Sequence, residues 1–417
     1  MQFWRALGSA LFILLTSQNL TYAGTLVIES WRADDKLMWE KVIIPAFEKK
    51  YPGITLKFSA TAPTEYDASI ATRLADGTAG ELITCRPFDV SLSLYRRGYL
   101  EKLDGASGMQ YFPPSSMLAW QTDDGQDSFC MPIASVIHGY LYNQTIFKSL
   151  NLQAPKTLTE FFTVLEAIKK NSNYVPVALG TKDKWEASQT VFTNSGPSFW
   201  HGEDGRRALI LGKAKLTDAP FVAAFEFQAK LGNYLAKNPN QQSYADSQRL
   251  FAQGGAAIFP LGSWDLAYFN RITGLEFGVF APPVPNPGEA CFISDHMDLG
   301  IGINRHASNK EDAYKFLAWV GSQEFAMLYT NYATGFFSLS NHLISVQDPI
   351  AQQMLDWRNR CSSSMRLNAH LLDRGIPNFE HALWDVNALL LNGKIKPKNA
   401  AKKLQTELAK WTQPRRP

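Results

Sequence analysis

Short apolar runs alternate with amphipathic segments from Gly24 to Arg97. Trp39, Ile43 and Phe47 follow one another at intervals of four residues, which is typical of one face of a helix. The strands expected in this part are Thr25–Ile28, Ile54–Phe58 and Glu81–Cys85. The helices expected beside them are Lys36–Lys50, Thr64–Gly77, opened by a capping box at Thr64–Asp67, and Val90–Arg97. This alternation predicts an α/β protein with a parallel sheet covered by helices.

The same alternation returns after residue 140. The strands expected there are Val175–Leu179 and Ala256–Pro260, and the helices are Leu158–Lys170, Phe221–Leu235, Tyr244–Gln253, Asn309–Ser322, Asp348–Cys361 and Pro397–Trp411. A proline-rich segment, Ala281–Pro287, interrupts this pattern. Because proline fixes φ and has no backbone N–H, we expect this segment to be extended and stiff, as a crossing between two lobes would be.

The first residues have the order of a secretory signal peptide. Arg5 supplies a positive start, Leu7–Leu15 is an apolar run, and Thr21–Ala23 resembles a signal-peptidase site. We therefore expect residues 1–23 to be removed near Ala23 and the mature protein to lie in the periplasm. The alternative is a short membrane anchor, but the apolar run is short for a bilayer of about 30 Å.

Charge and cysteine content argue against two kinds of partner, a nucleic acid and a metal ion. The net charge of the whole chain is +3, which gives no reason to expect a nucleic-acid partner. The four cysteines, Cys85, Cys130, Cys291 and Cys361, are widely spaced, so neither a zinc site nor any other metal or cofactor is expected. One or two disulfides are possible after export, with three connectivities open.

Five ordered segments resemble the family 1 extracellular solute-binding proteins of ABC sugar importers, the group that includes the maltose-binding protein. These segments are AFEKKYPGITLKF from Ala46, LYRRGYLEKLD from Leu94, Met131–Phe161, LFAQGGAAIFPLGSW from Leu250, and NKEDAYKFLAWVGSQEF from Asn309. The resemblance covers essentially all of the chain after residue 23.

The resemblance implies a two-lobed binding-protein fold of class II type with a ligand cleft between the lobes. The N-terminal lobe would comprise residues 24–135 and 285–337, and the C-terminal lobe residues 136–284 and 338–417. The chain would cross between them near Pro132–Gly139, Val279–Pro285 and Phe336–Ser340. Hinge closure would capture a saccharide, and a monomeric protein would deliver it to the membrane permease subunits of the importer.

A sugar is held by aromatic faces and by polar groups at fixed positions. In the first lobe, Trp31 and Arg32 follow the first expected strand, and Arg86 and Asp89 follow the third. Strand ends of this kind meet at the cleft of a doubly wound sheet. Trp31 would otherwise be packing, and Arg86 and Asp89 would otherwise form an internal ion pair.

Further ligand contacts are expected from the crossings and the second lobe. Trp264 is the strongest candidate, because the family commonly places a stacking Trp at its position in Gly262-Ser263-Trp264. The other candidates are Trp185, His138, His296 and Phe336. His138 has a structural alternative as a buried residue, and Phe336 as a hinge-packing residue. For His296 the alternative is a metal site with the flanking Asp295 and Asp298, but their spacing lacks a convincing ligand set.

The sugar itself stays open. Maltose-binding relatives carry an acidic residue in the first crossing, where this chain has Val136 and Ile137, so a plain maltodextrin is not expected. Arg32 and Arg86 leave an anionic sugar open. The alternatives are a secreted glycoside hydrolase, in which Asp89 and Asp298 would converge, and a binding protein for a polyamine. We expect no enzymatic activity.

Overall fold

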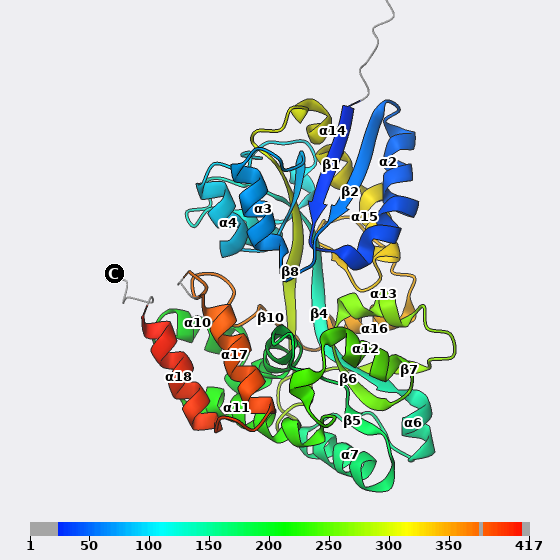
Figure 1. The fold of residues 1–417 in the computed structure, drawn as a ribbon, viewed down its shortest axis with the longest axis vertical. Helices are drawn as coiled ribbons and strands as arrows, with labels where there is room; N and C mark the ends of the chain where they lie inside the picture. Colours follow the sequence, from blue (N-terminus) through cyan, green and yellow to red (C-terminus); the bar gives the residue numbers. More distant parts are fainter. Residues whose placement is uncertain (1–23, 375–377, 411–417) are drawn as a thin grey trace, which may run out of the picture.

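The structure is a computed structural model that describes residues 24–374 and 378–410. The protein has two α/β lobes, one above the other in Figure 1. The long strands β4 (Met131–Asn143) and β8 (Phe292–Ile303) run from one lobe into the other. The expected signal peptide, residues 1–23, and Trp411 at the end of the last expected helix lie outside the described residues.

In the first lobe the sheet order is β2-β1-β3-β8. Its other strands are β1 (Gly24–Ser30), β2 (Ile54–Ala60) and β3 (Leu82–Cys85), and its helices are α1 (Lys36–Met38), α2 (Ile44–Lys50), α3 (Tyr66–Ala75), α4 (Asp89–Arg96), α5 (Pro114–Met117), α14 (Lys310–Val320) and α15 (Gln323–Tyr332). β1 is parallel to β2 and β3, as predicted, whereas β8 is antiparallel to β3. The sheet is therefore mixed, not purely parallel.

Two of the expected helices differ in detail from the expectation. The expected helix Lys36–Lys50 contains a wide turn in which Ile44 N–H donates to the Trp39 carbonyl, one residue before Pro45, which has no N–H to give. The expected capping box at Thr64–Asp67 is not formed, since α3 begins at Tyr66 without a side-chain cap. Asp67 instead accepts a hydrogen bond from Arg86.

In the second lobe β4 pairs with β6, and β6 pairs with β5. Its shorter strands are β5 (Val175–Val177), β6 (Ala256–Gly262), β7 (Phe277–Phe280) and β10 (Ser362–Ser364). Its helices are α6 (Gln144–Ser149), α7 (Leu158–Asn171), α8 (Thr193–Ser195), α9 (Pro197–Trp200), α10 (Glu203–Ile210), α11 (Ala219–Leu231), α12 (Tyr244–Ala252), α13 (Leu266–Phe269), α16 (Pro349–Leu355), α17 (Phe379–Leu391) and α18 (Pro397–Ala409). The expected helix Asp348–Cys361 ends earlier, in a 3-10 turn over Asp356–Asn359.

The proline-rich segment does not cross between the lobes. Val284 N–H donates to the Lys156 carbonyl at 3.0 Å, and Leu158 N–H donates to the Val284 carbonyl at 2.9 Å, so the segment packs at the start of α7 in the second lobe. Its prolines lack N–H groups and therefore cannot form a continuous ladder. The crossing expected there is made by β8, while β9 (Phe337–Ser338) pairs with β4 close to the third expected crossing. The lobe boundaries stay predictions.

The four cysteines form two disulfides, Cys85–Cys130 and Cys291–Cys361. The first joins the end of β3 to the residue before β4. The second joins the residues that precede β8 and β10, two strands that pair in parallel from Phe292 to Ser294. Each bridge therefore fixes one of the two long strands near its start.

We expect the Cys291→Ser/Cys361→Ser variant to lose about 2–4 kcal/mol of free energy of unfolding, because this bridge closes a long loop of the unfolded chain. The two cysteines are 70 residues apart. Urea unfolding of the variant and of the parent, each with and without reductant, measures the loss. Detection of free thiols in the non-reduced parent protein would contradict the predicted bridges.

Candidate ligand-binding cleft

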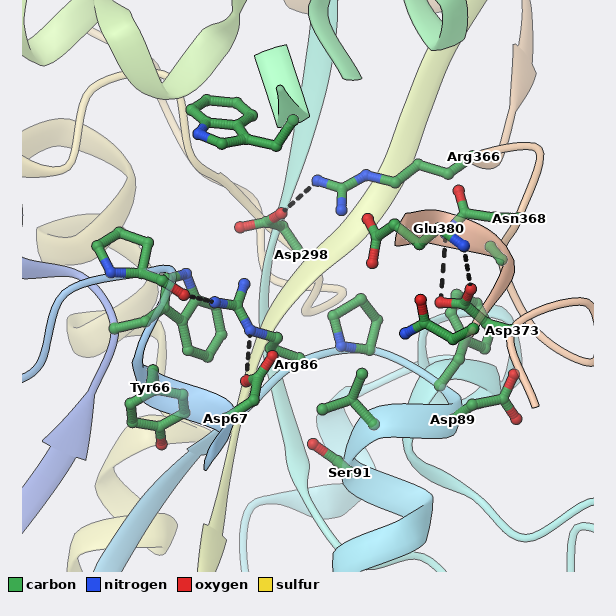
Figure 2. Close-up of a pocket in the computed structure, with 18 of the residues that line it drawn as sticks. Tyr66, Asp67, Arg86, Asp89, Ser91, Asp298, Arg366, Asn368, Asp373 and Glu380 are labelled. Atoms are coloured by element: carbon green, nitrogen blue, oxygen red, sulfur yellow. Dashed lines mark hydrogen bonds and ion pairs between the residues drawn. The ribbon is translucent and has the colours of Figure 1, made fainter. Parts of the chain in front are cut away.

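A cavity of about 480 Å³ lies between the lobes. This volume lies within the range of about 300–1,000 Å³ that is usual for small-molecule sites. Tyr66, Asp67 and Arg86 of the first lobe lie at one side of it, and Asn368 and Glu380 of the second lobe lie at the other (Figure 2). Both lobes therefore contribute side chains to one cavity.

Three aromatic residues of the second lobe form a fixed cluster at the cavity. Trp264 Nε1 donates to the Tyr244 hydroxyl at 2.9 Å, and the ring centroids of Trp185 and Tyr244 are 4.5 Å apart. The Trp264 ring folds back over Gly262, where an added Cβ would lie 2.2 Å from that ring. Gly262 thus permits the ring position, and the cluster presents flat apolar surface to the cavity.

The buried carboxyl group of Asp265 holds this cluster in place through hydrogen bonds. The Tyr244 hydroxyl and Gln248 Nε2 both donate to its Oδ1 atom. Burial raises the pKa of the Asp265 carboxyl to about 7, against the lowering effect of these two hydrogen bonds. The same burial raises the pKa of Tyr244 well above its ordinary value, so its hydroxyl stays protonated.

Arg86 does not pair with Asp89. Its Nε atom donates to Asp67 Oδ1 at 2.7 Å and its Nη2 atom to the Pro63 carbonyl at 2.8 Å. The guanidinium also lies over the Trp31 ring, with 4.6 Å between Cζ and the ring centroid. The alternative of an internal Arg86–Asp89 pair is therefore not realised, because Arg86 pairs with Asp67 and Asp89 pairs with Arg374.

Arg32 is neutralised within the first lobe. Its Nε and Nη2 atoms donate to the two carboxylate oxygens of Asp35 at 2.9 and 2.8 Å. Its guanidinium also lies over the Phe336 ring, with 4.6 Å between Cζ and the ring centroid. Phe336 is buried and does not line the cavity, so this expected contact residue packs beneath Arg32 instead.

Two buried histidines lie beneath Trp264. His138 meets the Trp264 ring edge to face at 5.1 Å, and its Nε2 atom is 3.0 Å from Nε2 of His296. His296 Nδ1 contacts the Met297 carbonyl, which makes Nδ1 the donor and leaves Nε2 with one lone pair. Arg366 Nε donates to this Nε2 atom at 2.9 Å, and His138 Nε2 shares the same acceptor. Burial and the charge of Arg366 hold the pKa of both histidines well below the usual range. Both imidazoles are therefore neutral.

Most of the chain matches the family model of the bacterial extracellular solute-binding proteins, over residues 34–327. The chain belongs to this family. The multiple sugar-binding protein of Streptococcus mutans is 26% identical over 294 residues, which is 67% of each chain.

Solved structures of other solute-binding proteins have the same fold as this one. The bacterial solute receptor AcbH, described as having an exclusive preference for β-D-galactopyranose, has a TM-score of 0.81 and 16% identity, with 94% of this chain and 100% of that chain covered. The protein RafE in complex with raffinose has a TM-score of 0.75 and 17% identity over 92% of this chain and 98% of that one. A chitin oligosaccharide binding protein has a TM-score of 0.77 and 19% identity over 92% and 98%.

The cavity of this solute-binding protein contains seven of the eleven residues expected from the sequence. These are Trp31, Arg32, Arg86, Asp89, Trp185, Trp264 and His296. The other four, His138, Gly262, Ser263 and Phe336, are buried around it. Ser263 Oγ accepts from Ile137 N–H at 3.0 Å and donates to the Gly335 carbonyl, so it joins the crossing segments instead of facing the cavity.

Sequence reasoning missed several residues that line the cavity. They are Tyr66, Asp67, Gln189, Tyr244, Arg366, Asn368, Asp373, Glu380 and Trp384. Asp67 had a visible signal, because it opens a helix beside the third strand. Residues 366–373 lie in an irregular loop with no periodic pattern, so no signal in the sequence marks them.

Two kinds of feature are absent from the described part of the chain, residues 24–374 and 378–410. No three His, Cys, Asp or Glu side chains there are placed to hold a metal ion. Within the same residues, none of the helices has the length and apolar character that a bilayer crossing requires.

The raised pKa of Asp265 gives a testable pH dependence. Between about pH 4 and about pH 7 the folded protein keeps the proton that the unfolded chain releases, so this group's contribution to stability falls as pH rises through that window. An asparagine at this position would not titrate, so the free energy of unfolding of Asp265→Asn should gain about 2–4 kcal/mol on that of the wild type as the pH rises from 4 to 8.

Urea unfolding of both proteins at several pH values measures this change. Asp246→Asn is the control, in which the pH dependence should have the opposite direction. Hydrogen bonds from Ser243 lower the pKa of Asp246, so the contribution of this carboxylate to stability is lost as the pH falls. Parallel pH profiles of wild type and Asp265→Asn would contradict the prediction.

Proposed function

We propose that this protein is the extracytoplasmic binding component of an ABC importer, and that it captures a small neutral saccharide by hinge closure and delivers it to the membrane permease. The observation that carries this proposal is the aromatic cluster of Trp264, Tyr244 and Trp185 at a cavity lined by both lobes. Closure lets a ligand touch both lobes at once, and that differential contact stabilises the closed state.

The arrangement of charge favours a neutral sugar over an anionic one. Arg32 is paired with Asp35, Arg86 with Asp67, and Arg366 with Asp298. An anionic ligand would have to compete with these internal carboxylates for the guanidinium groups. Hydroxyl groups of a neutral sugar need only the remaining hydrogen-bonding capacity, and its C–H faces fit the aromatic cluster.

The relatives support a saccharide ligand. The Streptococcus mutans relative is named for multiple sugars, and the structural neighbours are described with raffinose, chitin oligosaccharide, stachyose and β-D-galactopyranose. The ligands differ while the fold is shared, so the fold alone does not select one sugar.

A glycoside hydrolase and a polyamine-binding protein are less well supported. Hydrolysis would need two carboxyl groups free to act on a glycosidic bond, but Asp89 is bonded to Arg374 and to Leu371 N–H, and Asp298 to Arg366. A polyamine site needs carboxylates available to a cation, and Asp89 and Asp298 already have guanidinium partners. Asp373 and Glu380 also line the cavity, but burial raises the pKa of the Asp373 carboxyl well above its ordinary value, which reduces the negative charge that the two acids offer. We therefore propose a binding protein without catalytic activity.

We also propose that residues 1–23 direct export to the periplasm, that cleavage follows Ala23, and that the mature protein acts as a monomer. The order of positive, apolar and small residues supports the first two statements.

We expect one or a few small saccharides to raise the melting temperature of the purified mature protein. A thermal-shift screen of mono- to tetrasaccharides measures this, because a ligand that binds only the native state stabilises it by mass action. Chromatography of the sugars after long incubation should recover them unchanged. Cleavage of a sugar, or an unchanged melting temperature with every sugar of the panel, would contradict the proposed function.

We expect Trp264→Ala to weaken saccharide binding at least about 100-fold, because the variant loses a stacking face and releases the Tyr244 hydroxyl from its donor. Titration calorimetry with the sugar found in the screen measures the loss. Tyr174→Ala is the matched control, an exposed aromatic of the second lobe that does not line the cavity, and it should bind as the wild type does. Unchanged binding by Trp264→Ala would remove this residue from the site.

A further inference from the structure

An irregular loop of the second lobe, residues 365–374, is anchored to that lobe at several points. Met365 N–H donates to Glu203 Oε1 at 2.7 Å, and the buried Arg206 donates from Nη1 to the Ala369 carbonyl at 2.8 Å. Leu367 and Leu372 are buried in the apolar core of the second lobe. The loop is therefore a fixed part of the second lobe.

The same loop is also bonded to the first lobe. Leu371 N–H donates to Asp89 Oδ2 at 2.9 Å, and Arg374 Nε donates to Asp89 Oδ1 at 2.5 Å. Arg374 Nη1 and Nη2 donate to the two carboxylate oxygens of Asp123 at 2.9 and 2.6 Å. Asp89 begins α4 and Asp123 lies in a turn of the first lobe, so one guanidinium joins two first-lobe segments to the second lobe.

Two further observations indicate that this contact between the lobes is a specific part of the fold. The His370 ring stacks on Phe88 of the first lobe, with 5.5 Å between centroids. Leu371 has φ of 69°, a left-handed conformation that a branched side chain adopts only when its surroundings hold it there. In addition, the hydrogen bond from the Arg374 guanidinium lowers the pKa of Asp123 to about 2, so the pair is ionised near neutral pH.

The contact lies at one side of the cavity. Asp89, Asn368, Asp373 and Glu380 gather there, opposite Tyr66, Asp67 and Arg86 (Figure 2). The Asp89 and Arg374 side chains are only 11% and 22% exposed, so separating them would leave charges partly buried without partners. Phe88, Asp89 and His370 belong to this contact and also line the cavity, so the contact borders the space that a ligand would occupy.

We propose that Arg374 is a specificity-determining residue: by bonding loop 365–374 to Asp89 and Asp123, it closes one end of the cleft and limits the length of the saccharide that the cleft accepts. This inference builds on the proposed function and adds the size of the ligand. The bound sugar extends from the aromatic cluster only toward the other end of the cavity.

The test compares the wild type with Arg374→Ala over series of increasing length. The probes are galactose, raffinose and stachyose, and xylo- and chito-oligosaccharides from monomer to hexamer, titrated by calorimetry. In any series that binds, the wild-type affinity should fall sharply above a certain length, and Arg374→Ala should raise the affinity for the longer members at least about tenfold. Arg249→Ala is the matched control, since it breaks an exposed ion pair with Asp246 in the same lobe. It should keep the wild-type length limit.

Two results would overturn the proposal: a wild type that binds the longest sugars as tightly as the short ones, or an Arg374→Ala variant with an unchanged length limit. A wild type that binds no saccharide at all would instead refute the proposed function. The closed end is then tested without ligand, by hydrogen exchange of the backbone amides of residues 365–374. Faster exchange in Arg374→Ala than in Arg249→Ala supports the closed end, and equal exchange overturns it.

Discussion

Strands β4 and β8 pair with each other from Met131 to Ile137 of β4, and each continues into a sheet partner of its own. β8 continues beside β3 in the first lobe, and β4 continues beside β6 and β7 in the second. The backbone ladder between two strands thus fixes how both lobes are placed. The ladder also positions His138 of β4 and His296 of β8, whose imidazole Nε2 atoms contact each other on one face of the sheet.

The cavity is built from side chains that are already paired with one another. Trp264 donates to Tyr244, Tyr244 to Asp265, Arg86 to Asp67 and Arg366 to His296. Side chains restrained in this way lose little conformational freedom when a ligand arrives, so more of the contact energy appears as affinity. The same pairing gives Arg32, Arg86 and Arg366 each a carboxylate partner, which suits a ligand made of hydroxyls and C–H faces better than an anion.

The sequence predicted the local elements well, because the period of buried positions is a local property. Trp39, Ile43 and Phe47 are all buried on one helical stretch, and Ile54, Leu56 and Phe58 on one strand face. Position after a strand was also enough to bring Trp31 and Trp264 to the cavity. Pairings between distant segments were not predictable in this way. Four features depend on how the lobes assemble: the disulfide connectivity, the antiparallel β8, the partner of Arg86 and the position of residues 366–374. The prediction for the proline-rich segment was wrong because the stiffness of a segment does not specify where it lies in the fold.

The interleaving of the two lobes has a consequence for the order in which the protein folds. β3 ends at Cys85, yet its sheet neighbour β8 begins at Phe292, and α14 and α15 of the first lobe come later still. A chain that emerges from its N-terminus cannot complete the first lobe until β8 has been synthesised, and such distant contacts form slowly. The topology therefore makes completion of the first lobe a late event, which cannot come before most of the second lobe has been synthesised.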